Sequence, residues 1–232
     1  MGSTEDNKLI LYTNYLCPWA HRAQIVLAEL GIPFETVIID LDKPRTAEYL
    51  AINPRGLVPT INYNGKIIPE SGIVSQFLAD TYPSHLLKTS TEEGGALQRA
   101  EINFFIDAYM SKVNSMLYPA IRAEGAEKEE YVTKFVEAIS KEVEGLLKNA
   151  GPYFGGSDKL TFAEVMTGSF VLRLVSFSKN EKLLPTSLPK ALEEKTPNFW
   201  KWATAVANAK SVTYIWDEET VSTRTLERFG RK

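Results

Sequence analysis

The first eighty residues alternate between short apolar runs and amphipathic stretches. The apolar runs are typical of strands and occupy residues 8–13, 34–39, 58–63 and 66–68. Apolar positions recur at helical spacing in residues 18–30, 45–52 and 71–81. Asn64-Gly65, between the last two runs, predicts a hairpin turn. The pattern predicts the order β-α-β-α-β-β-α, with a parallel βαβ half and an antiparallel edge.

From about Glu92 onward the strand pattern gives way to amphipathic stretches. The predicted helices cover residues 97–122, 127–148, 161–177, 189–194 and 198–209. Thr161 and Glu164 predict a capping box at the start of the third, strongly apolar helix, which we expect at the centre of this half. The fold class is therefore α/β followed by all-α. We expect domains at 1–83 and 93–232, joined by a polar linker at 84–92.

Composition narrows the class of protein. The chain has 232 residues, 44% of them hydrophobic, a net charge of −3 and one cysteine. This balance gives no general attraction to nucleic acid or to an anionic membrane. No apolar run approaches the ~20 residues of a membrane span, and MGSTEDNK lacks the pattern of a secretory signal. A single cysteine fits a reducing compartment, so we expect a cytoplasmic protein, and we predict no metal site.

The single cysteine, Cys17, lies between a strand and a helix in the stretch NYLCPWAHRAQ. A lone cysteine is often only a small buried apolar residue. However, the free amides and dipole at a helix N-terminus favour a thiolate, and Pro18 suits the first helical turn. Residues 17–20, Cys-Pro-Trp-Ala, have the form of a dithiol motif whose second cysteine is replaced by alanine. The chemistry expected here is monothiol exchange with a thiol from solution.

Two further segments point to a peptide ligand. In NPRGLVPTI, a cis bond before Pro59 would turn the Val58 backbone outward to pair with an extended peptide. The alternative is an ordinary trans proline that starts a strand, since cis is uncommon among X–Pro bonds. In IIPESGIVSQFL, Ser71 is expected to cap a helix. The free amides at the N-terminus of that helix can also receive a carboxylate. Glu70 beside it can hold an ammonium group. Together they suit the head of an α-amino acid.

These three segments resemble the N-terminal domain of the cytosolic glutathione transferases, and Cys17 resembles the omega or fungal omega-like class. The resemblance covers essentially the whole chain, including a thioredoxin-like domain followed by a helical one. It implies glutathione as cosubstrate, with Cys17 opposite its sulfur. The implied glutathione contacts are Trp19, Lys43, Val58, Pro59, Glu70 and Ser71.

Other residues near these segments have competing interpretations. Lys43 would neutralise the glycyl carboxylate, yet beside Asp40 and Asp42 it also fits a solvated loop lysine. Tyr12 is expected to pack within its strand, and Tyr15 is an alternative hydrogen-bond donor to glutathione. Pro69 cannot donate to a strand ladder, so it could distort the edge strand. His21 fits an exposed helical residue as well as it fits a base and is not assigned to the site.

An electrophile pocket is implied along the long first helix of the second domain. Its expected lining is Tyr109, Val113, Tyr118 and Arg122. Such a stripe is usually core, and the C-terminal aromatic residues Tyr214 and Trp216 are further candidates for an apolar pocket.

The leading functional hypothesis is a glutathione-dependent thiol transferase in which Cys17 forms a mixed disulfide with glutathione. It would remove glutathione from adducts, or reduce disulfides or dehydroascorbate. The alternative is a glutathione transferase that sequesters hydrophobic aromatic compounds such as phenolics. A scaffold without activity has no need of Cys17. The resemblance also implies a homodimer, in which the thioredoxin-like domain of one subunit contacts the helical domain of the other.

Overall fold

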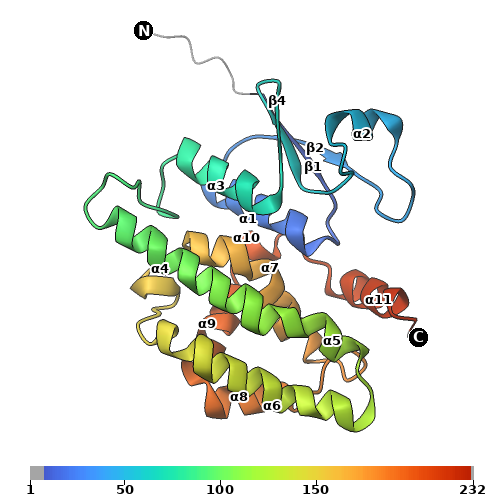
Figure 1. The fold of residues 1–232 in the computed structure, drawn as a ribbon, viewed down its shortest axis with the longest axis vertical. Helices are drawn as coiled ribbons and strands as arrows, with labels where there is room; N and C mark the ends of the chain where they lie inside the picture. Colours follow the sequence, from blue (N-terminus) through green and yellow to red (C-terminus); the bar gives the residue numbers. More distant parts are fainter. Residues whose placement is uncertain (1–7, 231–232) are drawn as a thin grey trace. The chain divides into compact units, whose positions relative to one another are not determined.

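The computed structural model describes residues 8–230 and divides the chain after Ser84 into an N-terminal and a C-terminal unit. The N-terminal unit combines a sheet with three helices, and the C-terminal unit is built from helices (Figure 1). Residues 1–7 and 231–232 lie outside the described residues. The prediction about a secretory signal in MGSTEDNK therefore falls almost entirely outside them.

The sheet of the N-terminal unit has four strands in the order β2-β1-β3-β4. They are β1 (Leu9–Thr13), β2 (Glu35–Ile38), β3 (Thr60–Tyr63) and β4 (Lys66–Pro69). The β1–β2 pair is parallel and the other two pairs are antiparallel, as the pattern predicts. β3 begins two residues later than expected, since Pro59 has no amide hydrogen for the ladder. Pro69 pairs with Thr60 at the end of β4, so it does not break the edge strand.

Three helices complete this unit, namely α1 (Pro18–Leu30), α2 (Ala47–Ile52) and α3 (Ser71–Thr81). The predicted bounds of α1 and α3 are confirmed. α1 ends at Gly31, whose left-handed backbone (φ 62°) favours glycine. α1 and α3 pack together, whereas α2 lies apart from them (Figure 1). α1 buries eight consecutive residues, Ala20 to Leu27, so the interpretation of His21 as an exposed residue is wrong.

A small core cluster of the N-terminal unit supports the segment around Cys17. Tyr12 packs against Tyr49 of α2, with ring centroids 5.6 Å apart, and Ala20 and Val58 complete the buried cluster. The expectation that Tyr12 packs within the fold is confirmed. Half-buried Cys17 packs against the same cluster, so the position of the thiol depends on this core.

The helices of the C-terminal unit are shorter and more numerous than predicted. The α-helices are α4 (Gly95–Ala108), α5 (Leu117–Arg122), α6 (Gly125–Glu142), α7 (Phe162–Phe177), α8 (Leu188–Lys195), α9 (Pro197–Ala207), α10 (Lys210–Thr213) and α11 (Glu218–Arg228). A π-helix (Tyr109–Val113) and 3₁₀ turns at Asn114–Met116, Glu144–Leu147 and Phe154–Gly156 complete the set.

Two expected helices are therefore wrong in extent. The stretch 97–122 is interrupted at residues 109–116, directly before α5. Pro119 lies in the first turn of α5, and it has no amide hydrogen to donate within a continuous helix. The stretch 127–148 leaves the α-helix at Val143 (φ −124°). The apolar pattern does not predict α11, which is largely polar. Asp217 caps this helix, and its Oδ1 accepts from the Thr220 amide at 3.0 Å.

The centre of the C-terminal unit is α7, as expected, with 15 of its 16 residues buried. It packs against α4 and α9. The predicted capping box forms, and the Glu164 carboxylate accepts from the Thr161 amide (2.7 Å), the Phe154 amide (2.9 Å) and Trp202 Nε1 (2.7 Å). Burial raises the pKa of Glu164, and these donors oppose that shift. The carboxyl group thus joins three segments of the unit, which is a structural role.

Candidate functional site

Cys17 lies in the loop between β1 and α1 and directly precedes the helix. Its backbone is extended (φ −82°, ψ 117°), and Pro18 occupies the first turn, where its missing amide hydrogen costs nothing. The thiol is half-buried, with Sγ 4.0 Å from the Val58 carbonyl oxygen, at the limit of a sulfur hydrogen bond. The thiol therefore faces the segment that leads into β3, at the open end of a helix that favours an anion.

Asn14 shapes the loop that carries Cys17, and the sequence analysis missed it. Its Oδ1 accepts from the Leu16 amide at 2.9 Å, and its backbone carbonyl accepts from the Cys17 amide at 3.1 Å. Its Nδ2 donates to the Ile39 carbonyl, just beyond β2, at 2.9 Å. An asparagine between a strand and a helix is a recognisable turn signal. The loop is thus fixed by a side chain to the neighbouring strand.

The Val58–Pro59 segment is held by buried hydrogen bonds. The peptide bond before Pro59 is cis. The Leu57 carbonyl accepts from the Tyr49 hydroxyl (2.6 Å) and from Asn53 Nδ2 (3.0 Å), and both donors are buried. Burial raises the pKa of Tyr49, so this hydroxyl remains a neutral donor. The backbone opposite Cys17 is therefore positioned from the side of α2.

Glu70 and Ser71 connect β4 to α3. Glu70 occupies the position before the helix with a left-handed backbone (φ 73°), and Ser71 is the first helical residue. The prediction that Ser71 caps α3 is therefore wrong, because its hydroxyl has a different partner. Ser71 Oγ accepts a hydrogen bond from Arg22 Nη1 at 3.2 Å. The Glu70 carboxylate forms an ion pair with the Arg55 guanidinium.

Arg22 and Arg55 were also missed by the sequence analysis. Arg22 lies on the buried face of α1, and its burial lowers its pKa to about 10, so it stays charged at neutral pH. Its Cζ lies 4.7 Å from the ring centroid of Trp19, whose residue is 45% exposed. An arginine among the apolar positions of α1 was the available signal for Arg22. Arg55 lies in the turn sequence Asn-Pro-Arg-Gly, and nothing in that sequence indicates that it pairs with Glu70.

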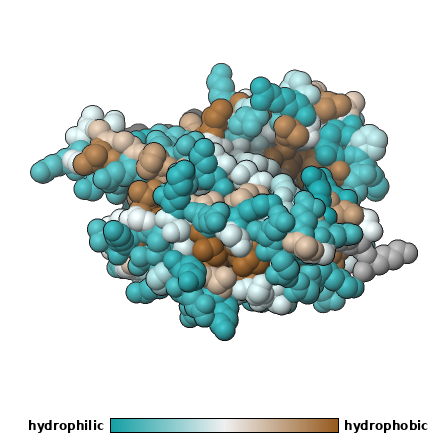
Figure 2. Space-filling view, turned by 60° about the horizontal axis from the view of Figure 1, so that its bottom comes forward, coloured by the Kyte–Doolittle hydropathy of each residue, from teal (hydrophilic) through white to brown (hydrophobic). Residues whose placement is uncertain are grey.

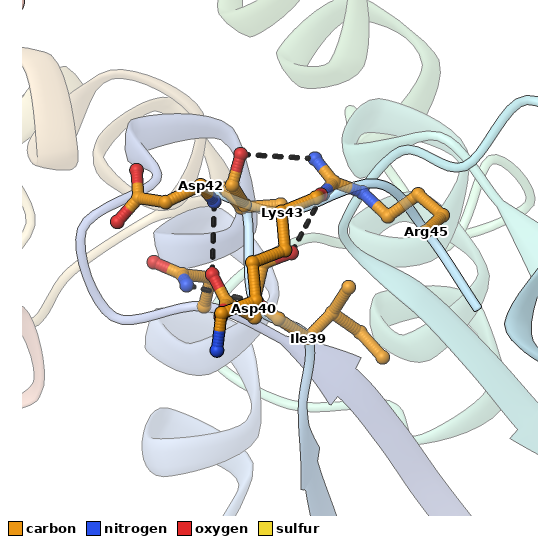
Figure 3. Close-up of polar contacts among 7 residues, drawn as sticks. Ile39, Asp40, Asp42, Lys43 and Arg45 are labelled. Atoms are coloured by element: carbon orange, nitrogen blue, oxygen red, sulfur yellow. Dashed lines mark hydrogen bonds and ion pairs between the residues drawn. The ribbon is translucent and has the colours of Figure 1, made fainter.

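Lys43 lies in the loop after β2 (Figure 3), and its ammonium group forms an ion pair with Asp40 Oδ2 at 3.3 Å. The Lys43 side chain is 80% exposed. A hydrogen bond from the Asp42 amide, followed by the contact with Lys43, holds the pKa of Asp40 below its usual value. Lys43 is therefore a solvated loop lysine in the structure, as one of the two interpretations has it. A ligand carboxylate would have to share its ammonium group with Asp40.

Arg45 joins the Lys43 loop to the segment before β3. Its Nη1 donates to the carbonyl oxygens of Asp40 and Lys43, both at 2.6 Å (Figure 3), and its Nε donates to the Gly56 carbonyl at 3.0 Å. The Lys43 loop, the Val58 segment, the Cys17 loop and the Glu70–Ser71 step are thus linked by a continuous set of contacts. All the residues expected to contact glutathione lie in this one unit.

The expected hydrophobic lining is divided by the structure. Tyr109 and Val113 are buried in the C-terminal unit, with Tyr109 packed beside Phe199 and Trp202. These two residues are core, which corrects their interpretation as pocket lining, because aromatic packing already fills the space around the Tyr109 ring. Burial also raises the pKa of the Tyr109 hydroxyl strongly.

Tyr118 and Arg122 have a different environment on α5. The Tyr118 ring lies 6.0 Å from the ring of Phe229, and Arg122 Cζ lies 4.8 Å from the same ring. Arg122 is exposed and Tyr118 is half-buried. These side chains hold the end of α11 against α5 and remain accessible in part.

The described residues also limit other chemistries. Within residues 8–230, histidine, cysteine and carboxylate side chains form no cluster of three or more that would hold a metal ion. No helix in that part of the chain is long and apolar enough to cross a membrane. The chemistry present is one thiol, a carboxylate–guanidinium pair beside a hydroxyl, and an exposed ammonium group.

Comparisons with known proteins agree with this arrangement. The family model for the glutathione S-transferase N-terminal domain matches residues 16–81. Glutathione S-transferase omega-1 of Sus scrofa is 28% identical over 220 residues, which are 92% of this chain and 83% of that protein. Glutathione transferase Omega 1C from Trametes versicolor is 26% identical with a TM-score of 0.78 over 97% of each chain. Omega 2S from the same organism, solved in complex with 2,4-dihydroxybenzophenone, is 22% identical with a TM-score of 0.78 over 95% of this chain and 99% of that one.

The element order of the N-terminal unit and the helical unit after it are the architecture of a glutathione transferase, which confirms the expected fold class. The cosubstrate of this class of enzyme is glutathione. Within the class, the chain is similar to the omega glutathione transferases, which confirms the resemblance stated from the sequence.

Proposed function

We propose that the enzyme is a thiol transferase in which Cys17 exchanges with glutathione disulfides. The observation that carries this proposal is the placement of the Cys17 thiol at the open end of α1, 4.0 Å from the Val58 carbonyl beside Pro59. A glutathione peptide paired with the Val58 backbone would bring its sulfur toward this thiol. The remaining contacts proposed for glutathione are Trp19, Lys43, Glu70 and Ser71.

The reaction has two exchange steps. The Cys17 thiolate attacks the glutathione sulfur of a mixed disulfide, forms a Cys17–glutathione disulfide and releases the other thiol. A second glutathione thiolate then attacks the glutathione sulfur of this adduct, which frees Cys17 and yields oxidised glutathione. The chain has no second cysteine to resolve the adduct, so this second thiol must come from solution. Removal of glutathione from adducts and reduction of small disulfides follow directly, and we include dehydroascorbate reduction in the proposal.

The test compares wild type with Cys17→Ser in two assays on the same preparations. We expect the variant to lose thiol transfer, because a hydroxyl cannot form the mixed disulfide. Conjugation of glutathione to a reactive aromatic halide should persist or rise, because serine can still donate a hydrogen bond to a bound glutathione thiolate. If thiol transfer survived in the variant, Cys17 would not be the nucleophile, and Tyr15 would be the next residue to replace.

Binding of aromatic compounds is a second proposed function. It is motivated by the partly accessible Tyr118 and Arg122 and by the exposed Tyr214, which is 50% accessible. A thermal-shift titration with 2,4-dihydroxybenzophenone, the ligand of the similar Omega 2S structure, should stabilise the wild type. Tyr118→Ala should reduce the shift. Equal shifts in the two proteins would place the ligand away from Tyr118.

Homodimer formation and a cytoplasmic location complete the proposal. Large apolar side chains are exposed in each unit, at 56% for Leu57 and 58% for Ile73, and at 63% for Leu97 and 61% for Phe104. Figure 2 shows hydrophobic residues reaching the surface among hydrophilic ones. Leu97 and Phe104 are two turns apart on one face of α4. Light scattering at micromolar concentration should give twice the chain mass, and Phe104→Glu should reduce it. A location in a reducing compartment would keep Cys17 available as a thiol.

A further inference from the structure

Arg55 and Glu70 form an ion pair that the folding of the chain does not explain. Arg55 lies in the turn before β3, and Glu70 lies fifteen residues later at the start of α3. Both side chains are substantially accessible, at 68% for Arg55 and 42% for Glu70. Ion pairs between such exposed groups add little to stability, because water screens them. The pair is therefore available to an external ligand.

The backbone of Glu70 is a second observation at the same place. Its φ of 73° lies in the left-handed region, which side-chain-bearing residues adopt rarely and at a cost in energy. Such conformations concentrate at ligand sites, where the direction of one side chain matters more than local stability. Here the conformation accompanies a carboxylate that meets the Arg55 guanidinium.

An adjoining carboxylate and guanidinium match one kind of ligand group. An α-amino acid carries its ammonium and carboxylate on the same carbon, so the protein groups that receive them must also adjoin. Glu70 supplies the negative partner and Arg55 the positive one. A guanidinium is well suited to the task because its planar fork binds both oxygens of a carboxylate.

We propose that Arg55 is a specificity-determining residue that binds the α-carboxylate of the γ-glutamyl group, while Glu70 binds the neighbouring ammonium. This inference rests on the proposed function, since it assumes that glutathione occupies the Glu70–Ser71 step. In the structure the two side chains neutralise each other. In the complex each exchanges part of that contact for the ligand group of opposite charge.

The other nearby cations are placed differently. The Arg22 guanidinium is buried and donates to Ser71 Oγ, so it orients the hydroxyl. Lys43 lies in a separate loop and is paired with Asp40. Arg45 is committed to backbone carbonyls. Arg55 is the cation in contact with the carboxylate proposed to hold the ammonium.

Calorimetry with two unreactive ligands tests the proposal on the full chain. One ligand is S-methylglutathione, and the other is S-methyl-(4-aminobutyryl)-cysteinyl-glycine, which lacks only the α-carboxylate. We expect the wild type to prefer the first by roughly tenfold or more, as for hydrogen bonds between charged groups. Arg55→Gln should lose most of this preference. Its affinity for the second ligand should stay the same or rise, because Glu70 is released from its guanidinium partner.

Two control variants exclude less specific explanations. Arg55→Lys, which keeps the charge without the fork, should retain part of the preference. Lys43→Gln removes a positive charge from another loop and should change both affinities by the same factor. A damaged fold or a general loss of positive charge would also weaken both ligands together in Arg55→Gln, and this result would overturn the proposal. A preference kept in Arg55→Gln but lost in Ser71→Ala would assign the carboxylate to Ser71 and also overturn it.

A further variant, Glu70→Gln, separates this proposal from the proposed function. If Glu70→Gln left the affinity for S-methylglutathione unchanged, glutathione would not occupy this step, and the proposed site itself would fail. If Glu70→Gln weakened binding while Arg55→Gln kept the preference for the α-carboxylate, the site would stand and only the role of Arg55 would be wrong.

Discussion

The two ends of the proposed glutathione site are held in different ways. At the Glu70–Ser71 end, side chains contact other side chains. Arg55 forms an ion pair with the Glu70 carboxylate, and Arg22 donates a hydrogen bond to the Ser71 hydroxyl. At the Lys43 end, Arg45 donates hydrogen bonds to backbone carbonyls. The Lys43 ammonium group is exposed and forms an ion pair with Asp40. The first end presents fixed functional groups, and the second presents a fixed loop with a solvated charge.

This difference determines where binding energy should concentrate. A charge partly removed from water interacts more strongly with a ligand than a solvated one, which salt and water screen. Arg22 is a buried cation behind Ser71, whereas the Lys43 side chain is 80% exposed. We therefore expect the γ-glutamyl end to dominate affinity and the glycyl end to adjust it.

The largest expected effect comes from Glu70→Gln. The variant keeps an acceptor of similar shape but removes the charge that receives the ligand ammonium. Hydrogen bonds to charged groups contribute about 1.5–3 kcal/mol, so the affinity for S-methylglutathione should fall roughly 10- to 150-fold. Calorimetry measures this directly, with urea unfolding as the control for stability. A fall smaller than that of Lys43→Gln would reverse the proposed order of the two ends.

An intermediate effect is expected from Arg45→Gln, which releases the Lys43 loop and Gly56 together. The loss of charge-assisted bonds to these carbonyls should lower the free energy of unfolding by about 1–3 kcal/mol. It should also weaken glutathione binding, since the loop and the segment before Val58 lose their common anchor. The rate of thiol transfer at saturating glutathione should change little, because Asn14 and Val58 define the surroundings of the thiol. A collapse of that rate with an unchanged KM would contradict this division of roles.

The smallest effect is expected from Lys43→Gln. Exposed pairs contribute about 0.2–1 kcal/mol, so affinity should fall no more than about fivefold, and less at high salt. The matched variant is Asp40→Asn, which frees the lysine from its partner and should leave affinity unchanged or raise it. A hundredfold loss in Lys43→Gln would show that the glycyl end dominates.

Local signals predicted much of the N-terminal unit. Pro18 and Gly31 bracket α1, and the step from Glu70 to Ser71 starts α3 at the expected residue. What the sequence did not reveal is the partner of each functional side chain. Arg22 reaches a serine 49 residues away, and such a contact depends on how α1 and α3 pack. The cap of α3 was misread for the same reason, because the Ser71 hydroxyl is engaged by that distant guanidinium.

The C-terminal unit shows where amphipathic spacing misleads. A continuous apolar stripe over residues 97–122 predicts one α-helix, but residues 109–116 form a π-helix and a 3₁₀ turn before α5. Apolar spacing also does not distinguish core from pocket lining, and of these two alternatives the burial of Tyr109 and Val113 favours the core. The polar α11 lacks such a stripe, and its sequence signal is the cap residue Asp217. In the structure Phe229, just after α11, contacts Tyr118 and Arg122.

The central claim is that Cys17 forms a mixed disulfide with glutathione. The most direct measurement is the intact mass of the full chain after incubation with oxidised glutathione at neutral pH. The account predicts the addition of one glutathionyl group, located at Cys17, reversed by reduced glutathione and absent from Cys17→Ser. A folded chain that keeps its unmodified mass under these conditions would contradict the claim.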